Sequence, residues 1–125
     1  MLIDTDVIIW FMRGSKKAGR VIEDNPGFRM SAVTYMELVQ GIRNKKELNL
    51  LRKAIKSWQA RVVYVDQEMS AKAVFFVEHY ALSHGISIAD ALIAGTALTL
   101  GESLLTGNKK HYAFIKGIEI SKFVP

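Results

Sequence analysis

Apolar and polar residues alternate along the chain in blocks that predict strands and helices in turn. Short apolar runs at residues 1–3, 61–65 and 103–106 are typical of buried strands, and weaker candidates lie at residues 28–30 and 118–120. Between these runs, apolar residues recur at the three- and four-residue spacing of helices, which predicts helices that begin near residues 5, 15, 31, 45, 67 and 87. Strands that alternate with helices indicate an α/β fold, a three-layer α/β/α sandwich with a central parallel sheet and right-handed crossovers.

The first ten residues contain the sharpest change of polarity. The apolar run Met1–Ile3 ends in Asp4, a second carboxylate follows at Asp6, and apolar residues then resume in a short helix that we expect Thr5 or Asp6 to cap. A strand this apolar belongs in the middle of a parallel sheet that is covered on both faces. Asp4 then lies at the carboxyl end of that strand, where open α/β sheets place their sites. A carboxylate buried there needs a partner.

Two of the predicted helices carry more large apolar residues than one small core needs. Residues 45–60 form the clearest amphipathic helix, and residues 67–84 form a long helix that Val74–Val77 make apolar almost all round. Such a helix is either central or lies at a subunit contact. We therefore predict a homodimer that uses apolar surface from one of these two helices.

Composition narrows the class of protein. The chain has 125 residues, of which 50% are hydrophobic and 23% charged, so we expect one folded domain over residues 1–125. The absence of cysteine excludes disulfide scaffolds and thiolate metal sites. A net charge of +5 suits a polyanionic partner. Asp4 and Asp6 interrupt the N-terminal apolar run, and no uncharged stretch is long enough to cross a bilayer, so a cytoplasmic protein without membrane contact is expected.

Three carboxylates stand among apolar residues, each just after a strand or in the first turn of a helix: Asp4, Glu37 and Asp90. Taken singly, each has a structural explanation, because Thr34–Glu37 and Ser87–Asp90 match the capping-box pattern and Asp4 is a possible helix cap. Taken together, they would gather at the carboxyl edge of the sheet and repel one another. A shared hard cation such as Mg²⁺ or Mn²⁺ would compensate this repulsion, since the ligand set offers oxygen only.

Four motifs occur in the chain in a fixed order: Leu2-Ile-Asp-Thr-Asp6, Ser31-x-x-Thr-x-x-Glu-Leu38, Ile88-Ala-Asp-Ala-Leu-Ile-Ala94 and Leu105-Thr-x-Asn108. In this order they resemble PIN-domain ribonucleases, most closely the VapC-like toxins of toxin–antitoxin pairs, over essentially the whole chain. The resemblance implies a metal-dependent endoribonuclease with Asp4, Glu37 and Asp90 around Mg²⁺ or Mn²⁺. It also implies a homodimer and a small antitoxin partner that blocks the site.

The chain departs from this family in the stretch after the fourth predicted strand. Members often place a further acid there, whereas this chain has Asn108 and His111. Occupancy of a second metal site is therefore left open, and so is whether Asp6 partly replaces the missing acid. Thr106 and Asn108 are uncharged and suited to hydrogen-bond a phosphate oxygen. His111 is either a donor to phosphate or an ordinary surface residue.

The residue types indicate how such a site would work. A cation held by Asp4 and Asp90 would acidify a water molecule and neutralise charge on the scissile phosphate. Glu37 would orient that water, take its proton or act as a further ligand. Three basic runs, at residues 13–17, 43–46 and 109–110, are either contacts for the RNA backbone or solvated faces.

The sequence is also compatible with two other functions, each from a different class. An apolar strand that ends in Asp4-Thr-Asp6 also resembles the opening motif of haloacid-dehalogenase-type phosphatases, in which Asp4 would be the nucleophile and Asp6 the acid–base group. That family needs a later paired acidic motif after a strand, which this chain lacks. The second alternative is a PIN-like module that no longer cleaves and only binds RNA or a protein.

Overall fold

Five parallel strands form the single sheet of this protein, for which a computed structural model describes residues 1–125. The strand order is β3-β2-β1-β4-β5, which places β1 at the centre. The strands are β1 (Leu2–Ile3), β2 (Arg29–Ser31), β3 (Arg61–Val63), β4 (Leu104–Thr106) and β5 (Ile120–Lys122). All four pairings are parallel, as the sequence predicts. The last strand begins two residues later than the expected run at residues 118–120.

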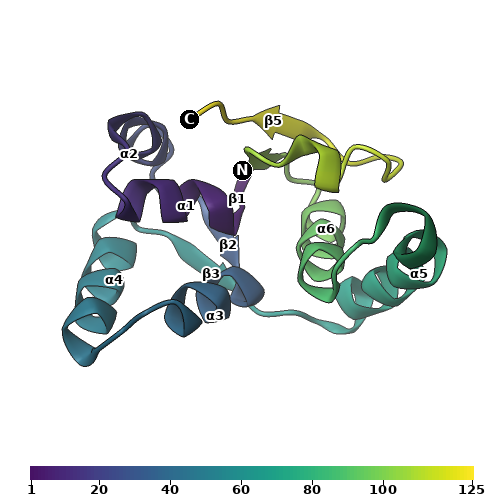
Figure 1. Cartoon of the computed structure of the whole chain (residues 1–125), viewed down its shortest axis with the longest axis horizontal. Coiled ribbons are helices and arrows are strands. Elements are labelled where there is room, and N and C mark those ends of the chain that lie inside the picture. Colours follow the sequence, from purple (N-terminus) through teal and green to yellow (C-terminus); the bar gives the residue numbers. More distant parts are fainter.

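Six α-helices and one short 3₁₀ helix connect these strands (Figure 1). They are α1 (Thr5–Met12), α2 (Lys16–Glu23), α3 (Ala32–Gln40), α4 (Lys45–Ser57), α5 (Gln67–His84), α6 (Ile88–Leu100) and η1 (Lys109–His111). The predicted boundaries of the long helix hold, because Asp66 caps its start and Gly85 ends it in the left-handed conformation, with φ at 62°.

The sequence offers more than one candidate cap for two of the helices, and the structure decides between them. Helix α1 is capped by Asp4, not by Thr5 or Asp6, because Asp4 is the last residue with an extended backbone and helical dihedrals begin at Thr5. For helix α3 the structure selects the expected start near residue 31 over the Thr34–Glu37 capping box, which lies one turn later. Its cap is Ser31, whose hydroxyl accepts the N–H of Val33. The Ser87 cap of α6 is confirmed, since its hydroxyl accepts the N–H of Asp90.

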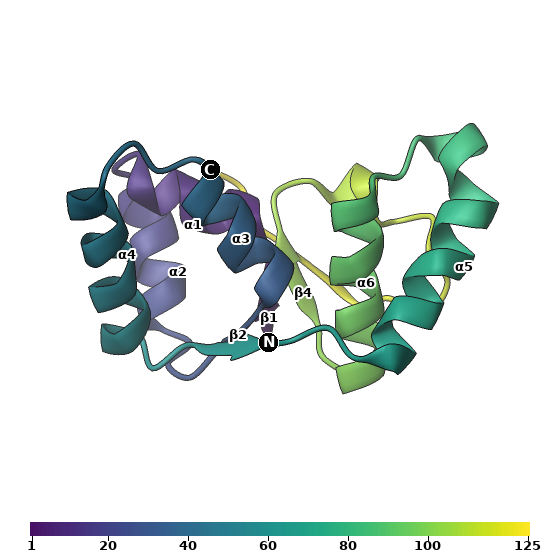
Figure 2. The same cartoon turned by 90° about the horizontal axis from the view of Figure 1, so that it is seen from below.

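Alternate residues of the central strands point into two separate apolar cores. Leu2 and Leu104 pack with α5 and α6, whereas Ile3 and Leu105 pack with α1, α2 and α4. Figures 1 and 2 show these two groups of helices on opposite sides of the molecule, with α3 between them. The sheet is therefore the middle layer of an α/β/α sandwich, which confirms the predicted fold class.

The order of the strands brings distant parts of the chain to one edge of the sheet. β1 and β4 are neighbours, so Asp4 after β1 and Thr106 at the end of β4 come together although 102 residues separate them. Helix α6 returns to β4 through a turn at Gly101, so the start of α6, with Asp90, reaches the same edge (Figure 2). No helix of the protein has the length and apolar character that a membrane span requires.

Candidate functional site

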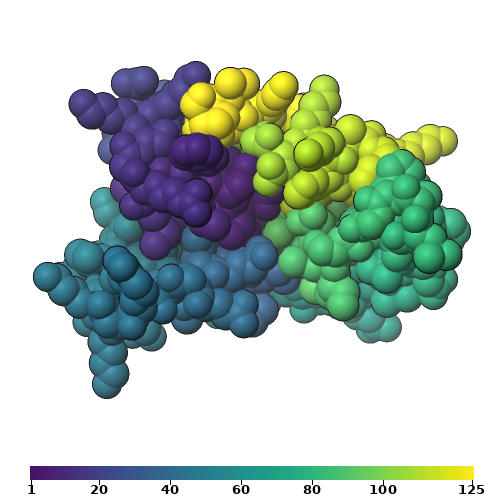
Figure 3. Space-filling model, in the orientation of Figure 1, coloured from purple at the N-terminus to yellow at the C-terminus, as the bar shows by residue number.

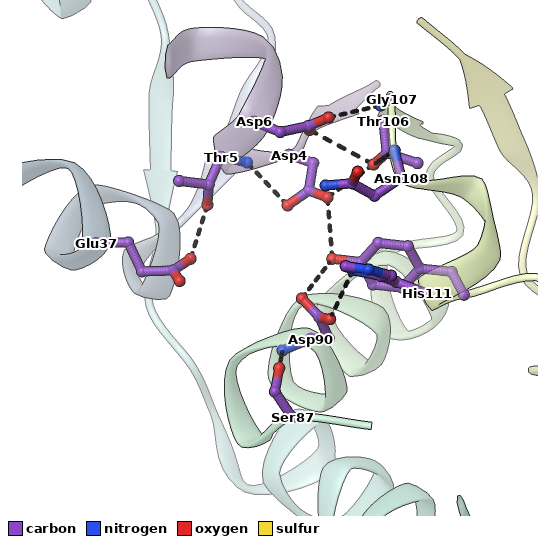
Figure 4. Close-up of polar contacts among 11 residues, drawn as sticks. Asp4, Thr5, Asp6, Glu37, Ser87, Asp90, Thr106, Gly107, Asn108 and His111 are labelled. Carbon is purple, nitrogen blue, oxygen red and sulfur yellow. Dashed lines mark hydrogen bonds and ion pairs between the residues drawn. The ribbon is translucent and has the colours of Figure 1, made fainter. Parts of the chain in front are cut away.

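Asp4 is the most buried acid of the protein, with 5% of its surface exposed. Its Oδ1 accepts the N–H of Thr5 at 2.8 Å, and its Oδ2 accepts the hydroxyls of Thr106 at 2.8 Å and Tyr112 at 3.0 Å (Figure 4). Burial raises the pKa of Asp4 to about 6, with a further contribution from the nearby charge of Asp6, while these hydrogen bonds oppose the rise.

Asp90 lies in the first turn of α6 and is held at both of its oxygens. Oδ1 is 3.0 Å from the hydroxyl of Tyr112, and Oδ2 is 3.3 Å from Nδ1 of His111. Tyr112 follows η1 and is fully buried. Its hydroxyl thus stands between Asp4 and Asp90 and joins them (Figure 4). We call these two acids the carboxylate pair.

The carboxylate pair carries more negative charge than its surroundings balance. A phenol has one hydrogen, so the Tyr112 hydroxyl can donate to Asp4 or to Asp90 but not to both at once. Burial and the two neighbouring carboxylates also raise the pKa of Tyr112, which keeps the phenol protonated. No lysine or arginine forms an ion pair with either acid; His111 is the only basic side chain at the pair. This uncompensated set of oxygen donors fits a divalent cation.

Glu37 reaches the site by a different route. Its Oε1 lies 2.8 Å from the hydroxyl of Thr5, which is also 3.0 Å from the hydroxyl of Thr34 (Figure 4). Glu37 is therefore linked to Asp4 through the next residue in the chain. No group of three or more histidine, aspartate or glutamate side chains is arranged to chelate one ion. The structure thus joins Asp4 and Asp90 through the Tyr112 hydroxyl and leaves Glu37 on Thr5.

Asp6 is directed at the turn after β4. Its Oδ2 accepts the N–H of Gly107 at 2.8 Å, and its Oδ1 lies 3.5 Å from the Thr106 hydroxyl. A Cβ at position 107 would lie 2.7 Å from Asp6 Oδ2 and 3.3 Å from the carbonyl oxygen of Phe123, so a larger residue there would displace the Asp6 carboxylate. Burial raises the pKa of Asp6. The phosphatase alternative needs Asp6 as an acid–base group, but its carboxylate is engaged by a backbone N–H.

The remaining predicted residues lie in the same turn. Thr106 is fully buried and donates to Asp4, while the N–H of Asn108 donates to the Thr106 hydroxyl at 3.0 Å. The Asn108 side chain makes no hydrogen bond within the chain. His111 is partly exposed beside Asp90. Among the basic runs, Lys109–Lys110 belongs to this turn, whereas Arg43 pairs with Glu47 one helical turn away.

Sequence reasoning missed three residues of the site: Thr5, Gly107 and Tyr112. Each is ordinary by itself in the sequence, and each makes its contact with a residue from another element. One signal was available for Tyr112. It is a tyrosine next to the candidate His111, and a buried tyrosine normally finds a partner for its hydroxyl.

The fold and the site define an α/β protein with acidic residues gathered at the carboxyl edge of a parallel sheet. The chain belongs to the PIN domain family, which it matches over residues 1–116. It is 30% identical to Ribonuclease VapC1 of Methanocaldococcus jannaschii over 123 residues, which cover 93% of this chain and 81% of that protein. It is 28% identical to Ribonuclease VapC19 of Mycobacterium tuberculosis over 125 residues, which cover 94% and 96%.

Solved structures of similar chains agree with this assignment. VapBC-1 from nontypeable Haemophilus influenzae contains a chain that is 26% identical, with a TM-score of 0.77 and coverage of 97% of this chain and 96% of that one. A toxin–antitoxin complex from Klebsiella pneumoniae contains one that is 25% identical, with a TM-score of 0.74 and coverage of 94% and 93%. The resemblance to VapC-like PIN proteins seen in the sequence is thereby confirmed.

Proposed function

We propose that this protein is a metal-dependent endoribonuclease and the toxin of a toxin–antitoxin pair, formed by one nuclease domain over residues 1–125 that acts in the cytoplasm. The observation that carries the proposal is the carboxylate pair, Asp4 and Asp90, at the carboxyl edge of the sheet without a lysine or arginine partner. Membership of the PIN domain family and the relatives named as ribonucleases support the reaction.

The carboxylate pair would hold Mg²⁺ or Mn²⁺, with Glu37 as a further ligand or as the group that orients the attacking water. When bound, such an ion supplies positive charge for the scissile phosphate and acidifies water. Thr5 holds the Glu37 carboxylate toward the site through its hydroxyl. Glu37 would then accept a proton from the attacking water, the task of a general base.

The turn after β4 would contact the phosphate. Asn108 has a free amide and His111 is partly exposed, so both can donate hydrogen bonds to phosphate oxygens. Lys109 and Lys110 are exposed in the same turn and add positive charge there. Thr106 is committed to Asp4, so its role is to orient that carboxylate and not to bind the phosphate.

The direct test is cleavage of labelled RNA by the purified protein with Mn²⁺, with Mg²⁺ and with a chelator. We expect cleavage that needs the metal and that Asp4→Asn removes, while Asp24→Asn, at an exposed position after α2, retains it. An aryl phosphate serves as a second substrate. Hydrolysis of the aryl phosphate without RNA cleavage would favour the phosphatase alternative, and RNA binding without cleavage would favour the non-cleaving module.

The proposed homodimer would use α5. This helix exposes 58% of Val74 and 51% of Phe75, and Ile88 at the start of α6 is 72% exposed. Ile88 lines an apolar groove of about 580 Å³ between α3 and α6, where the atoms of both helices border each other in Figure 3. With Val74 it also lines a second apolar hollow of about 350 Å³ between α5 and α6. Burial of this surface by a second copy would remove an unusually apolar face from water.

The proposed antitoxin would use a different surface. An apolar pocket of about 380 Å³ lies between α1 and α4, where Met12 is 46% and Leu50 is 57% exposed. The similar chains in toxin–antitoxin complexes support a small protein partner. A partner seated between α1 and α4 would leave α5 free for the dimer.

Two matched substitutions test the proposed dimer surface and the proposed antitoxin surface independently. Phe75→Glu should convert a dimer, measured by light scattering, to a monomer and leave binding of the co-expressed antitoxin intact. Leu50→Glu should abolish binding of the antitoxin and leave the dimer intact, since it puts a charge into the apolar pocket between α1 and α4. A wild-type protein that is monomeric at micromolar concentration would contradict the dimer. If expression of this protein inhibits growth and co-expression of a short neighbouring reading frame does not relieve the inhibition, the proposed antitoxin partner is contradicted.

A further inference from the structure

The hydroxyl of Tyr112 is the single point of contact between the two acids of the carboxylate pair. We propose that Tyr112 is a positioning residue, which orients Asp90 against Asp4 so that the pair can bind a divalent cation. The inference rests on the proposed function, because it concerns the same site. It concerns the hydroxyl group alone, since the ring has a separate place in the core.

The ring of Tyr112 is held in place by contacts that do not involve its hydroxyl. Tyr112 is fully buried in the core that α5 and α6 share with the sheet. Its backbone is also held, because its N–H donates to the carbonyl of Lys109 at 3.0 Å and its own carbonyl accepts the N–H of Ile115 at 2.9 Å. The position of the hydroxyl is therefore set by packing and not by the acids that it contacts.

The two acids depend on this hydroxyl to different degrees. Asp4 keeps two other donors, the N–H of Thr5 and the hydroxyl of Thr106. At Asp90 Oδ1 the hydroxyl is the only partner, and its other oxygen has only the more distant His111, at 3.3 Å. Loss of the hydroxyl should therefore release Asp90 far more than Asp4, and the spacing of the pair would no longer be fixed.

A released Asp90 should bind a cation less tightly. Hydrogen bonds that orient the ligands of a metal are worth about 10- to 100-fold in affinity or activity. If Tyr112 served only the core, phenylalanine would fill the same space and metal affinity would not change. The affinity for the metal alone, without RNA, thus separates a positioning role from a purely structural one.

The test is calorimetric titration of Mn²⁺ into Tyr112→Phe in the absence of RNA. We expect the affinity for Mn²⁺ to fall by about 10- to 100-fold, with a circular dichroism spectrum like that of the wild type. The matched control is Tyr64→Phe, which removes a hydroxyl from a side chain that is 79% exposed. Tyr112→Phe with wild-type affinity for Mn²⁺ would overturn the inference.

A second measurement keeps the test decisive if Tyr112→Phe does not fold. The chain has four tyrosines, so ¹³C labelling of the tyrosine Cζ gives four signals, of which three can be assigned with Phe substitutions of Tyr35, Tyr64 and Tyr80. On addition of Mg²⁺ to the wild type, the remaining signal, that of Tyr112, should shift most. A Tyr112 signal that does not move as Mg²⁺ binds would overturn the inference.

Asp4→Asn distinguishes failure of this inference from failure of the proposed function. If Asp4→Asn loses Mn²⁺ binding and Tyr112→Phe does not, only the role of Tyr112 is overturned. If Asp4→Asn binds Mn²⁺ as the wild type does, the metal site is overturned, and the role of Tyr112 with it. Loss of binding in both variants supports both.

Discussion

Asp4 and Asp6 are two residues apart in the chain, yet their carboxylates contact different parts of the molecule. Asp4, the last extended residue of its segment, faces Tyr112 and through it Asp90, which forms the carboxylate pair. Asp6 is already helical, and its carboxylate holds the N–H of Gly107 in the turn after β4. Two acids in one short segment thus differ in their surroundings, because Asp4 is linked to a second carboxylate whereas Asp6 holds the backbone of a turn.

The largest effect should come from breaking the carboxylate pair. Asp4→Asn should lower metal-dependent RNA cleavage by more than about 100-fold, because residues that only orient metal ligands already contribute about 10- to 100-fold. The Asn amide can donate to the Tyr112 hydroxyl, which then donates to Asp90, so the fold should persist. Single-turnover cleavage at saturating Mn²⁺ measures the loss. Wild-type cleavage by Asp4→Asn would refute the metal site.

The raised pKa of Asp4 should make the metal-free protein less stable as the pH rises. The folded protein keeps a proton on Asp4 up to about pH 6, whereas the unfolded chain releases it near the ordinary pKa of 3.8. The contribution of Asp4 to the free energy of unfolding should therefore fall by about 3 kcal/mol between about pH 4 and pH 6, and not further above it. Urea unfolding in a chelator measures this slope.

Asp4→Asn provides the control for this pH dependence. The free energy of unfolding of Asp4→Asn should lack the fall between about pH 4 and pH 6 that Asp4 causes. At pH 7 without metal, Asp4→Asn should therefore be more stable than the wild type. Saturating Mn²⁺ should reverse the order of the two proteins, since it binds only the wild-type pair. Equal slopes in the two proteins would mean that Asp4 ionises normally in the fold.

Glu37 should affect the reaction more than metal binding, because it contacts Thr5 and not the carboxylate pair. Glu37→Gln should lower cleavage by about 100-fold, as expected for loss of a general base, while the affinity for Mn²⁺ changes far less than in Asp4→Asn. Calorimetry alongside cleavage separates these effects, with Glu23→Gln at an exposed position of α2 as the control. A loss of Mn²⁺ affinity equal to that of Asp4→Asn would make Glu37 a metal ligand.

Asp6 should respond in the way expected of a residue that holds a turn. Asp6→Asn keeps an oxygen for the Gly107 N–H and should cleave RNA within a few-fold of the wild type. Asp6→Ala leaves that N–H without its partner and should lower the free energy of unfolding by about 1 to 2 kcal/mol. Chemical denaturation and cleavage assays on both variants provide the comparison. Loss of cleavage in Asp6→Asn would give Asp6 a role in the reaction.

The smallest effect is expected at Asn108, whose side chain makes no hydrogen bond within the chain. Asn108→Ala should reduce cleavage less than Asp4→Ala does, because a neutral amide attracts a divalent cation weakly. Asn108→Asp should tighten binding of Mn²⁺ in the absence of RNA, since it adds a hard anionic oxygen. Calorimetric titration of both proteins decides this. Unchanged affinity would place residue 108 away from the metal.

Much of the fold follows from the sequence by itself. The alternation of apolar runs and helical spacing predicts the α/β/α sandwich, and the bounds of α5 follow from its pattern and from Gly85. The motifs around Asp4, Glu37 and Asp90 also point to the PIN domain family, to which the chain belongs. These features depend on local signals, because periodicity, caps and motif order are all read from neighbouring residues.

The arrangement of the acids is decided only by the tertiary structure. Tyr112 meets Asp4 across 108 residues of sequence and Asp90 across 22. The direction of Asp6 depends on the one position at which extended backbone becomes helix, for which the sequence left Asp4, Thr5 and Asp6 as candidate caps. The pairing of β1 with β4 and the packing of the Tyr112 ring are long-range contacts, and no local pattern encodes which atoms they bring together.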